Sequence, residues 1–211
     1  MGKYKNAYRI ESARMRNWDY SWAALYFVTI CVKDRICSFG EIVEGKMKLS
    51  AIGKIAKQEW LKTFEMRPDM NLTMGEFVVM PNHFHAIIGI GKNEYNTRDG
   101  QRRDAMHCVS TLPTTSTTNT TDNLRNAPKN QFGPQSKNLA SIIRGFKIGV
   151  TKNGRIIDPD FAWQSRFHDH IIRDNDSFER IYQYIQNNPT QWQKDSFYPQ
   201  KHNRINESRL D

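Results

Sequence analysis

The chain has 211 residues, of which 38% are hydrophobic and 11% aromatic, and its 31 basic and 22 acidic residues give a formal net charge of +9. This length predicts one domain with or without an insertion, and the positive charge favours a polyanionic partner such as nucleic acid. Apolar runs such as residues 23–31 are too short to span a bilayer, and the first twenty residues lack the apolar segment of a signal peptide. Three cysteines argue against a disulfide framework, so a cytoplasmic location is expected.

Strand and hairpin patterns occupy the first fifty residues. Residues 22–32 are aromatic and β-branched, which predicts a buried strand. Residues 40–49 alternate around Glu44 and Gly45, which predicts a β-hairpin. The same stretch approaches the pattern of a phosphate-binding P-loop, but Met47 stands where a hydroxyl must bind magnesium, which argues against nucleotide binding.

A helix and a second hairpin are predicted next. Ser50 is a suitable N-cap for a helix over residues 51–65, whose apolar residues recur at helical spacing. Two strand-like runs, 75–80 and 83–90, are joined by the turn pair Pro81-Asn82.

The second half of the chain predicts helix, strand and helix. Apolar residues at helical spacing predict a helix that Gly154 ends, and residues 163–172 have the character of a strand. Asp174 or Asp176 can cap a last helix, which stops at Pro189.

Two histidines near the start of the strand at 83–90 are the first candidates for chemistry. His83 and His85 are two residues apart, so they project from one face of the strand, while Phe84 and Ala86 project from the other into the core. Two imidazoles at this spacing can reach one metal ion. Polar residues on a half-exposed strand are the structural alternative, although a strongly apolar strand behind a Pro-Asn turn is an unusual setting for it.

The last helix offers further candidates. Tyr184 and Asn188 are four residues apart and share one side of the helix. Tyr182 falls within the apolar stripe and is expected to pack, whereas Tyr184 lies at the margin of the stripe. A tyrosine at such a margin often only packs, with its hydroxyl in water.

Together these motifs resemble a known family. Residues 78–88 and 184–189 are similar to the single-tyrosine HUH transposases of small bacterial insertion sequences, and most closely to the REP-associated tyrosine transposases. Further similar segments follow in the family's order at 26–31, 39–40, 141–147, 163–164 and 169–173. The resemblance implies an α+β fold, with an antiparallel sheet and packed helices in the ferredoxin-like arrangement of HUH nucleases.

The same resemblance implies the activity and the roles of four residues. His83, His85 and Asn188 would hold a divalent metal, with Mg²⁺ or Mn²⁺ favoured by the absence of a thiolate, and Tyr184 would attack DNA to form a 5′-phosphotyrosine. The implied function is that of a nickase and strand transferase acting on single-stranded, hairpin-containing DNA, as a monomer or homodimer. The alternative is a domesticated DNA-binding protein on the same scaffold that no longer mobilises DNA.

The domain organisation follows from this resemblance and from composition. One transposase-like catalytic domain is expected from residues 1–90 and 137–189, with a polar tail over 190–211. Residues 91–136 form a Thr/Asn-rich insertion that we expect to be disordered, because seven threonines fall within 110–121 and apolar residues are few.

Other histidine chemistries fit less well. A histidine-triad nucleotide hydrolase needs a third alternating histidine, but position 87 is isoleucine, and two-histidine phosphoesterases need a second His-x-Ser/Thr motif that is absent from the sequence. His168 and His170 form a second His-x-His, which would suit a four-histidine hydrolase. The family resemblance matches only His170, for which DNA contact and structural hydrogen bonding remain open.

Basic and polar residues beside the matched motifs are candidates for DNA contact. Each of them could instead be an ordinary solvated group. The candidates are Arg144, Lys147, Arg166, His170 and Arg173.

Overall fold

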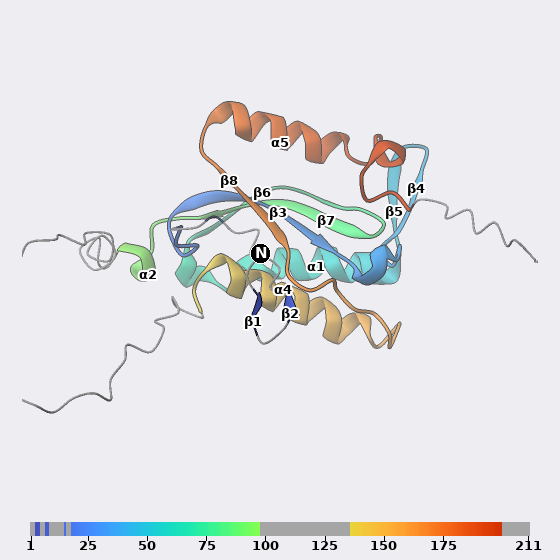
Figure 1. The fold of residues 1–211 in the computed structure, drawn as a ribbon, viewed down its shortest axis with the longest axis horizontal. Coiled ribbons are helices and arrows are strands. Elements are labelled where there is room, and N and C mark those ends of the chain that lie inside the picture. Colours follow the sequence, from blue (N-terminus) through green and yellow to red (C-terminus); the bar gives the residue numbers. More distant parts are fainter. Residues whose placement is uncertain (1–2, 5–6, 9–14, 16–17, 98–135, 200–211) are drawn as a thin grey trace, which may run out of the picture.

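A computed structural model describes residues 3–4, 7–8, 15, 18–97 and 136–199 (Figure 1). Most of the predicted insertion, and residues 200–211 of the predicted tail, lie outside the described residues. Within the described ranges, no helix is both long and apolar enough to cross a membrane.

The described residues form strands, α-helices and short 3₁₀ turns. The strands are β1 (Lys3–Tyr4), β2 (Ala7–Tyr8), β3 (Ala24–Cys31), β4 (Gly40–Val43), β5 (Lys46–Leu49), β6 (Leu72–Val79), β7 (His83–Ile90) and β8 (His168–Ile172). The α-helices are α1 (Ala51–Glu65), α2 (Glu94–Thr97), α4 (Leu139–Gly154) and α5 (Asn175–Asn187). Three 3₁₀ turns are η1 (Lys33–Arg35), η2 (Pro68–Met70) and η3 (Trp192–Lys194).

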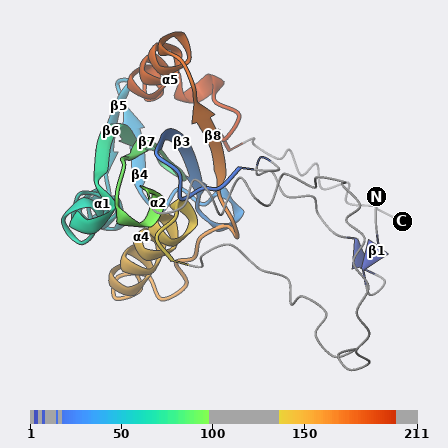
Figure 2. The same cartoon turned by 90° about the vertical axis from the view of Figure 1, so that its left-hand side faces the viewer.

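A four-stranded sheet of order β6-β7-β3-β8 is the centre of the fold, and all its neighbouring strands are antiparallel. Helices α1 and α4 cover one face, and α5 lies over the other (Figures 1 and 2). Strands β1 and β2, and strands β4 and β5, form two separate two-stranded ribbons. The predicted α+β class with packed helices is therefore confirmed.

Local capping explains why the helices begin where they do. Ser50 Oγ accepts the amide of Gly53, so α1 starts at the predicted residue. Asn138 caps α4 by accepting the amide of Ser141 in a reciprocal capping box. Asp174, one of the two predicted caps, accepts the amide of Ser177 at the start of α5.

Strand β7 is buried along its whole length and separates two apolar clusters. Phe84, together with Ala86, packs into the larger cluster beneath α1 and α4, as the alternation predicts. On the opposite face, Ile87 packs against Ile185 of α5. Burial of each such aliphatic side chain is worth about 1.5–3 kcal/mol, so the second cluster holds α5 against the sheet.

The hairpin over 40–49 agrees with the prediction, whereas the start of strand β8 does not. The predicted hairpin over 40–49 is β4–β5, with Glu44 at φ 50° and Gly45 at φ 70° in its turn, and no phosphate-binding loop forms there. Strand β8 begins at His168, later than predicted, because Trp163 forms only an isolated bridge to Val32.

The segments just before and just after residues 98–135 both contact the carboxylate of Asp69. Asp69 accepts hydrogen bonds from the hydroxyl of Tyr95 and the ammonium group of Lys137, which also lies 4.8 Å from the centre of the Tyr95 ring. These charge-assisted contacts hold the pKa of Asp69 below its usual value.

Candidate functional site

The two histidines of β7 lie side by side under α5. His83 pairs with Cys31 and His85 with Thr29 in the register between β7 and β3, and the two imidazole centres are 4.5 Å apart. Both side chains are buried. Burial, followed by the charge of Arg35, lowers the pKa of His83 to about 3, and burial lowers that of His85 well below its usual value. Both imidazoles are therefore neutral at pH 7, the form that binds metals.

Each histidine has one ring nitrogen engaged by a neighbour. His83 Nδ1 lies 2.9 Å from Asn82 Oδ1, and His85 Nδ1 lies 2.8 Å from Thr29 Oγ1. Partners of this kind orient metal-binding imidazoles and determine which nitrogen carries the proton. His83 Nε2 is left without a hydrogen-bond partner, whereas His85 Nε2 lies within hydrogen-bond distance of the Tyr184 hydroxyl.

Tyr184 approaches the histidines from α5. Its hydroxyl lies 3.2 Å from His85 Nε2, and its ring forms a T-shaped pair with that of Phe27, with ring centres 6.1 Å apart. The side chain is still 44% exposed, so a ligand can reach it. Burial of the hydroxyl, followed by the charge of Asp195, raises the pKa of Tyr184.

The neighbouring tyrosine has the packing role that helix periodicity predicts. Tyr182 stacks on Phe178 with ring centres 6.0 Å apart and packs against the cluster of Ile87 and Ile185. Its hydroxyl accepts a hydrogen bond from Gln186 on the outer side of α5.

Asn188 and an unpredicted carboxylate complete the site. Asn188 is the C-cap of α5, is buried, and donates from Nδ2 to Asp195 Oδ2 at 3.1 Å. That same oxygen lies 3.9 Å from His83 Nε2, and the Asp195 side chain is only 4% exposed. Asp195 was not expected from the sequence, because it lies in the segment interpreted as a polar tail. After Pro189 the chain turns through η3, which returns Asp195 to the histidines.

The donor atoms fit a divalent metal ion. One ligand atom from each of His83, His85 and Asp195 lies within 4.8 Å of the other two, which makes them a cluster of metal-ligand side chains among the described residues. Within the same residues, His83 Nε2 and Asn188 Oδ1 are buried without a hydrogen-bond partner. Buried polar atoms are rarely left unpaired, so the presence of one on His83 and one on Asn188, which bonds to Asp195, supports a cation site here.

Aromatic rings from the segment after α5 pack against the histidines. Phe197 lies 4.6 Å from the His83 ring, and Trp192 lies 5.9 Å from it on a tilted plane. The described part of the predicted tail is thus a wall of the site.

The four-histidine alternative does not agree with the sheet register. His168 of β8 pairs with Thr29, which pairs on its other side with His85. Strand β3 therefore separates the two histidine pairs by two strand spacings, about 9–10 Å. His168 and His170 are not part of the clustered donor group found among the described residues.

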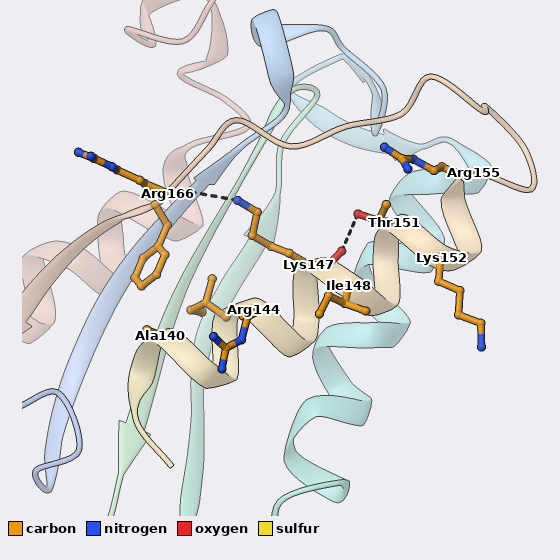
Figure 3. Close-up of a pocket in the computed structure, with 10 residues that line it drawn as sticks. Ala140, Arg144, Lys147, Ile148, Thr151, Lys152, Arg155 and Arg166 are labelled. Carbon is orange, nitrogen blue, oxygen red and sulfur yellow. Dashed lines mark hydrogen bonds between the residues drawn. The ribbon is translucent and has the colours of Figure 1, made fainter. Parts of the chain in front are cut away.

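Three of the five predicted DNA contacts line a cavity on the opposite side of the sheet. Arg144, Lys147 and Arg166 border a hollow of about 570 Å³ along the outer face of α4, together with Lys152 and Arg155 (Figure 3). Five cationic side chains around one hollow make it a candidate surface for phosphate groups.

Lys147 also has a local structural role. Its ammonium group donates to the carbonyls of Gln164 and Arg166, at 2.7 and 3.1 Å, and lies 5.7 Å from the Trp163 ring centre. Burial lowers the pKa of Lys147. Lys147 thus holds the loop before β8 against α4.

The other two candidates lie at the edge strand. His170 is exposed on β8, and Arg173 follows the end of that strand. Both border a second hollow of about 430 Å³, to which Arg180 of α5 also contributes.

The chain is similar in fold to a solved structure and in sequence to a bacterial protein. No protein-family model matches the chain. The fold is similar to a solved structure of a REP-associated tyrosine transposase bound to a REP hairpin, with a TM-score of 0.49 and 16% identity over 91% of this chain and 74% of that one. An uncharacterized protein of Haemophilus influenzae strain Rd is 36% identical over 191 residues, which cover 89% of this chain and 92% of the relative. The chain belongs to the same family as this Haemophilus influenzae protein.

Proposed function

We propose that this chain is a metal-dependent DNA nickase and strand transferase of the tyrosine-transposase type. The observation that carries the proposal is the position of the Tyr184 hydroxyl, 3.2 Å from His85 Nε2, in a site where His83 Nε2 and Asn188 Oδ1 are buried without hydrogen-bond partners. A nucleophile adjoining a cation site is the arrangement that phosphoryl transfer requires. The motif resemblance supplies the substrate class, which is single-stranded DNA with hairpins.

Four side chains would hold the metal. They are His83, His85 and Asp195, with Asn188 supplying the unpaired amide oxygen. Two imidazoles, a carboxylate and an amide oxygen suit Mn²⁺ or Mg²⁺, with Mn²⁺ favoured by the nitrogen ligands. When bound, the ion would neutralise charge that develops on the phosphate oxygens.

Tyr184 would act as the nucleophile. A bond forms between its phenolic oxygen and phosphorus, the bond from phosphorus to the 3′-oxygen breaks, and a 3′-hydroxyl and a 5′-phosphotyrosine result. Because its pKa is raised, Tyr184 is protonated at neutral pH, so its proton must leave as the new bond forms. The proton taken up by the 3′-oxygen balances the step, and the phosphotyrosine keeps the bond energy for rejoining.

The cationic hollow on α4 would bind the DNA backbone away from the reacting bond. Arg144 and Arg166 can each contact a phosphate there, while Lys147 keeps the loop that carries Arg166 in place. His170 and Arg173 would contact the strand at the β8 edge. Backbone contacts of this kind position DNA without selecting its sequence.

The proposal is tested by trapping the covalent intermediate. Purified protein is incubated with Mn²⁺ and a pool of end-labelled single strands that carry a hairpin with randomised flanks, followed by denaturing electrophoresis and peptide mass spectrometry. A nucleotide adduct on Tyr184 is expected, and Tyr184→Phe should abolish it. Tyr182→Phe is the matched control, because it removes a hydroxyl from the same helix and should leave adduct formation intact.

Three outcomes would contradict the proposal. An adduct on Tyr182, or one formed by Tyr184→Phe, would overturn the assignment of the nucleophile. Hairpin binding without any adduct would favour the alternative, a DNA-binding protein that has kept the scaffold.

A further inference from the structure

We propose that Asn82 is a positioning residue that sets the tautomer of His83 and docks the segment carrying Asp195. The use of this arrangement in metal binding rests on the proposed function. Asn82 occupies the tight turn between β6 and β7, and its side chain is buried. Its side chain connects strand β7 to two segments that are far apart in sequence, one around Arg35 and one around Phe197.

The orientation of the Asn82 amide is determined by its partners. Nδ2 donates to two backbone carbonyls, those of Arg35 at 3.0 Å and Phe197 at 2.8 Å. Carbonyl oxygens only accept hydrogen bonds, so the amide cannot be flipped without placing oxygen against oxygen. Asn82 Oδ1 must therefore be the atom that faces His83.

This orientation decides the protonation of His83. Asn82 Oδ1 can only accept, so the hydrogen bond of 2.9 Å to His83 Nδ1 requires a proton on Nδ1. In a neutral imidazole the lone pair then resides on Nε2. His83 Nε2 is the buried, unpaired atom that lies 3.9 Å from Asp195 Oδ2. The lone pair is thus fixed in the direction of the donor group.

The same amide connects His83 to the third ligand. Phe197, whose carbonyl Asn82 binds, donates its own backbone amide to Asp195 Oδ1 at 2.7 Å. Arg35 strengthens this connection, because its guanidinium donates to the carbonyl of Ser196 at 3.0 Å. One side chain therefore controls both the direction of a ligand lone pair and the placement of a carboxylate.

Two measurements on the metal-free protein test this role directly. Long-range ¹H–¹⁵N correlation at pH 7 reports which nitrogen of His83 carries the proton, with His83→Gln used only to assign the signal. Hydrogen exchange of the Phe197 amide reports whether the segment around Asp195 is docked. The wild-type protein should show a protonated Nδ1 and a protected Phe197 amide.

Two substitutions separate the functions of the amide. Asn82→Ala removes both, so His83 should populate the other tautomer and the Phe197 amide should exchange faster. Asn82→Asp keeps an acceptor but loses both donors, so His83 should retain its proton on Nδ1 while the Phe197 amide still exchanges faster. Asn93→Asp is the matched control, because Asn93 Nδ2 also donates to two backbone carbonyls, those of Met70 and Gly91, away from the site.

Metal binding provides the third readout. Outer partners of metal ligands typically contribute about 10- to 100-fold to affinity, so Asn82→Ala should raise the Kd for Mn²⁺, measured by calorimetry, by about that factor. Asn93→Asp should leave the Kd unchanged.

The inference can fail independently of the proposed function. A proton on His83 Nε2 in the wild-type protein, or an Asn82→Ala variant with unchanged tautomer and exchange, would overturn it even if DNA adducts form. An absence of DNA adducts would overturn the nickase, while the tautomer and exchange measurements would still decide the role of Asn82.

Discussion

Replacing Asp195 with Asn tests whether the carboxylate that the sequence did not predict is a metal ligand. The substitution removes the charge but keeps an oxygen that can accept the amide of Phe197, as Asp195 Oδ1 does at 2.7 Å. The local turn should therefore survive. The metal-free protein should unfold within about 1 kcal/mol of the wild type, on the scale of one altered hydrogen bond.

The effect on metal binding should be much larger. The Asp195 side chain is only 4% exposed, so little solvent screens its charge from a nearby cation. We expect its loss to raise the Kd for Mn²⁺ by about 100-fold, which is the upper end of the effect known for residues that only support a metal ligand. At a Mn²⁺ concentration 100 times the wild-type Kd, binding stabilises the wild type by about 2.7 kcal/mol and the variant by only about 0.4 kcal/mol. The metal-induced rise in Tm should fall from roughly 5–11 °C to about 1 °C.

The assay is thermal unfolding with and without Mn²⁺ at one fixed concentration. Asp158→Asn is a suitable control, because Asp158 also accepts the backbone amide two residues along the chain, at 3.1 Å, but lies outside the site. An Asp195→Asn variant that keeps the full metal-induced rise would refute the assignment. In that case Asn188 would be the remaining oxygen ligand, as the family resemblance implies.

Three further changes have defined outcomes. Burial lowers the pKa of His83 to about 3 from an unfolded value of 6.5. The free energy of unfolding should therefore be at its full value above pH 6.5 and should fall between pH 6.5 and about 3, by up to about 1.4 kcal/mol per pH unit. In urea unfolding, His83→Gln should lose less stability over this range, and a pH dependence equal to that of the wild type would contradict this account. Lys147→Met should lower stability by about 1 kcal/mol, through its bonds to Gln164 and Arg166, in a denaturant titration. Arg144→Glu should weaken binding to a single-stranded hairpin and reduce the salt slope by about 0.7–0.9 per lost phosphate contact, whereas a salt slope equal to that of the wild type would exclude Arg144 from the interface.

Much of the fold was predictable because local signals agreed with tertiary packing. The Ser50 cap and the apolar spacing after it predicted α1 over the residues that it occupies. Alternation along β7 predicted that His83 and His85 share the face opposite Phe84, and the clusters on the two sides of the sheet confirm it. Such periodicities are properties of a single element, so one sequence is sufficient to detect them.

The part of the site that could not be predicted depends on contacts between distant segments. Asp195 follows the last helix in a polar stretch without periodicity, and only the turn through η3 brings it back to His83. The DNA contact predicted for Lys147 stays a prediction, but its bonds to two carbonyls of a loop without regular structure could not be read from the sequence. A sequence pattern does not specify which part of the fold an irregular segment packs against.

The shared contact of Tyr95 and Lys137 with Asp69 makes this protein suitable for insertion of a reporter domain. Tyr95 and Lys137 reach the same carboxylate, so the chain leaves the fold and re-enters it at one anchored point. A compact reporter whose own termini are close together could replace residues 98–135 without separating those anchors. Lengthening a flexible connection is also inexpensive, since each doubling costs only about 0.6 kcal/mol. A fluorescent domain spliced there should report on the protein's location while leaving the face beneath α5 unobstructed.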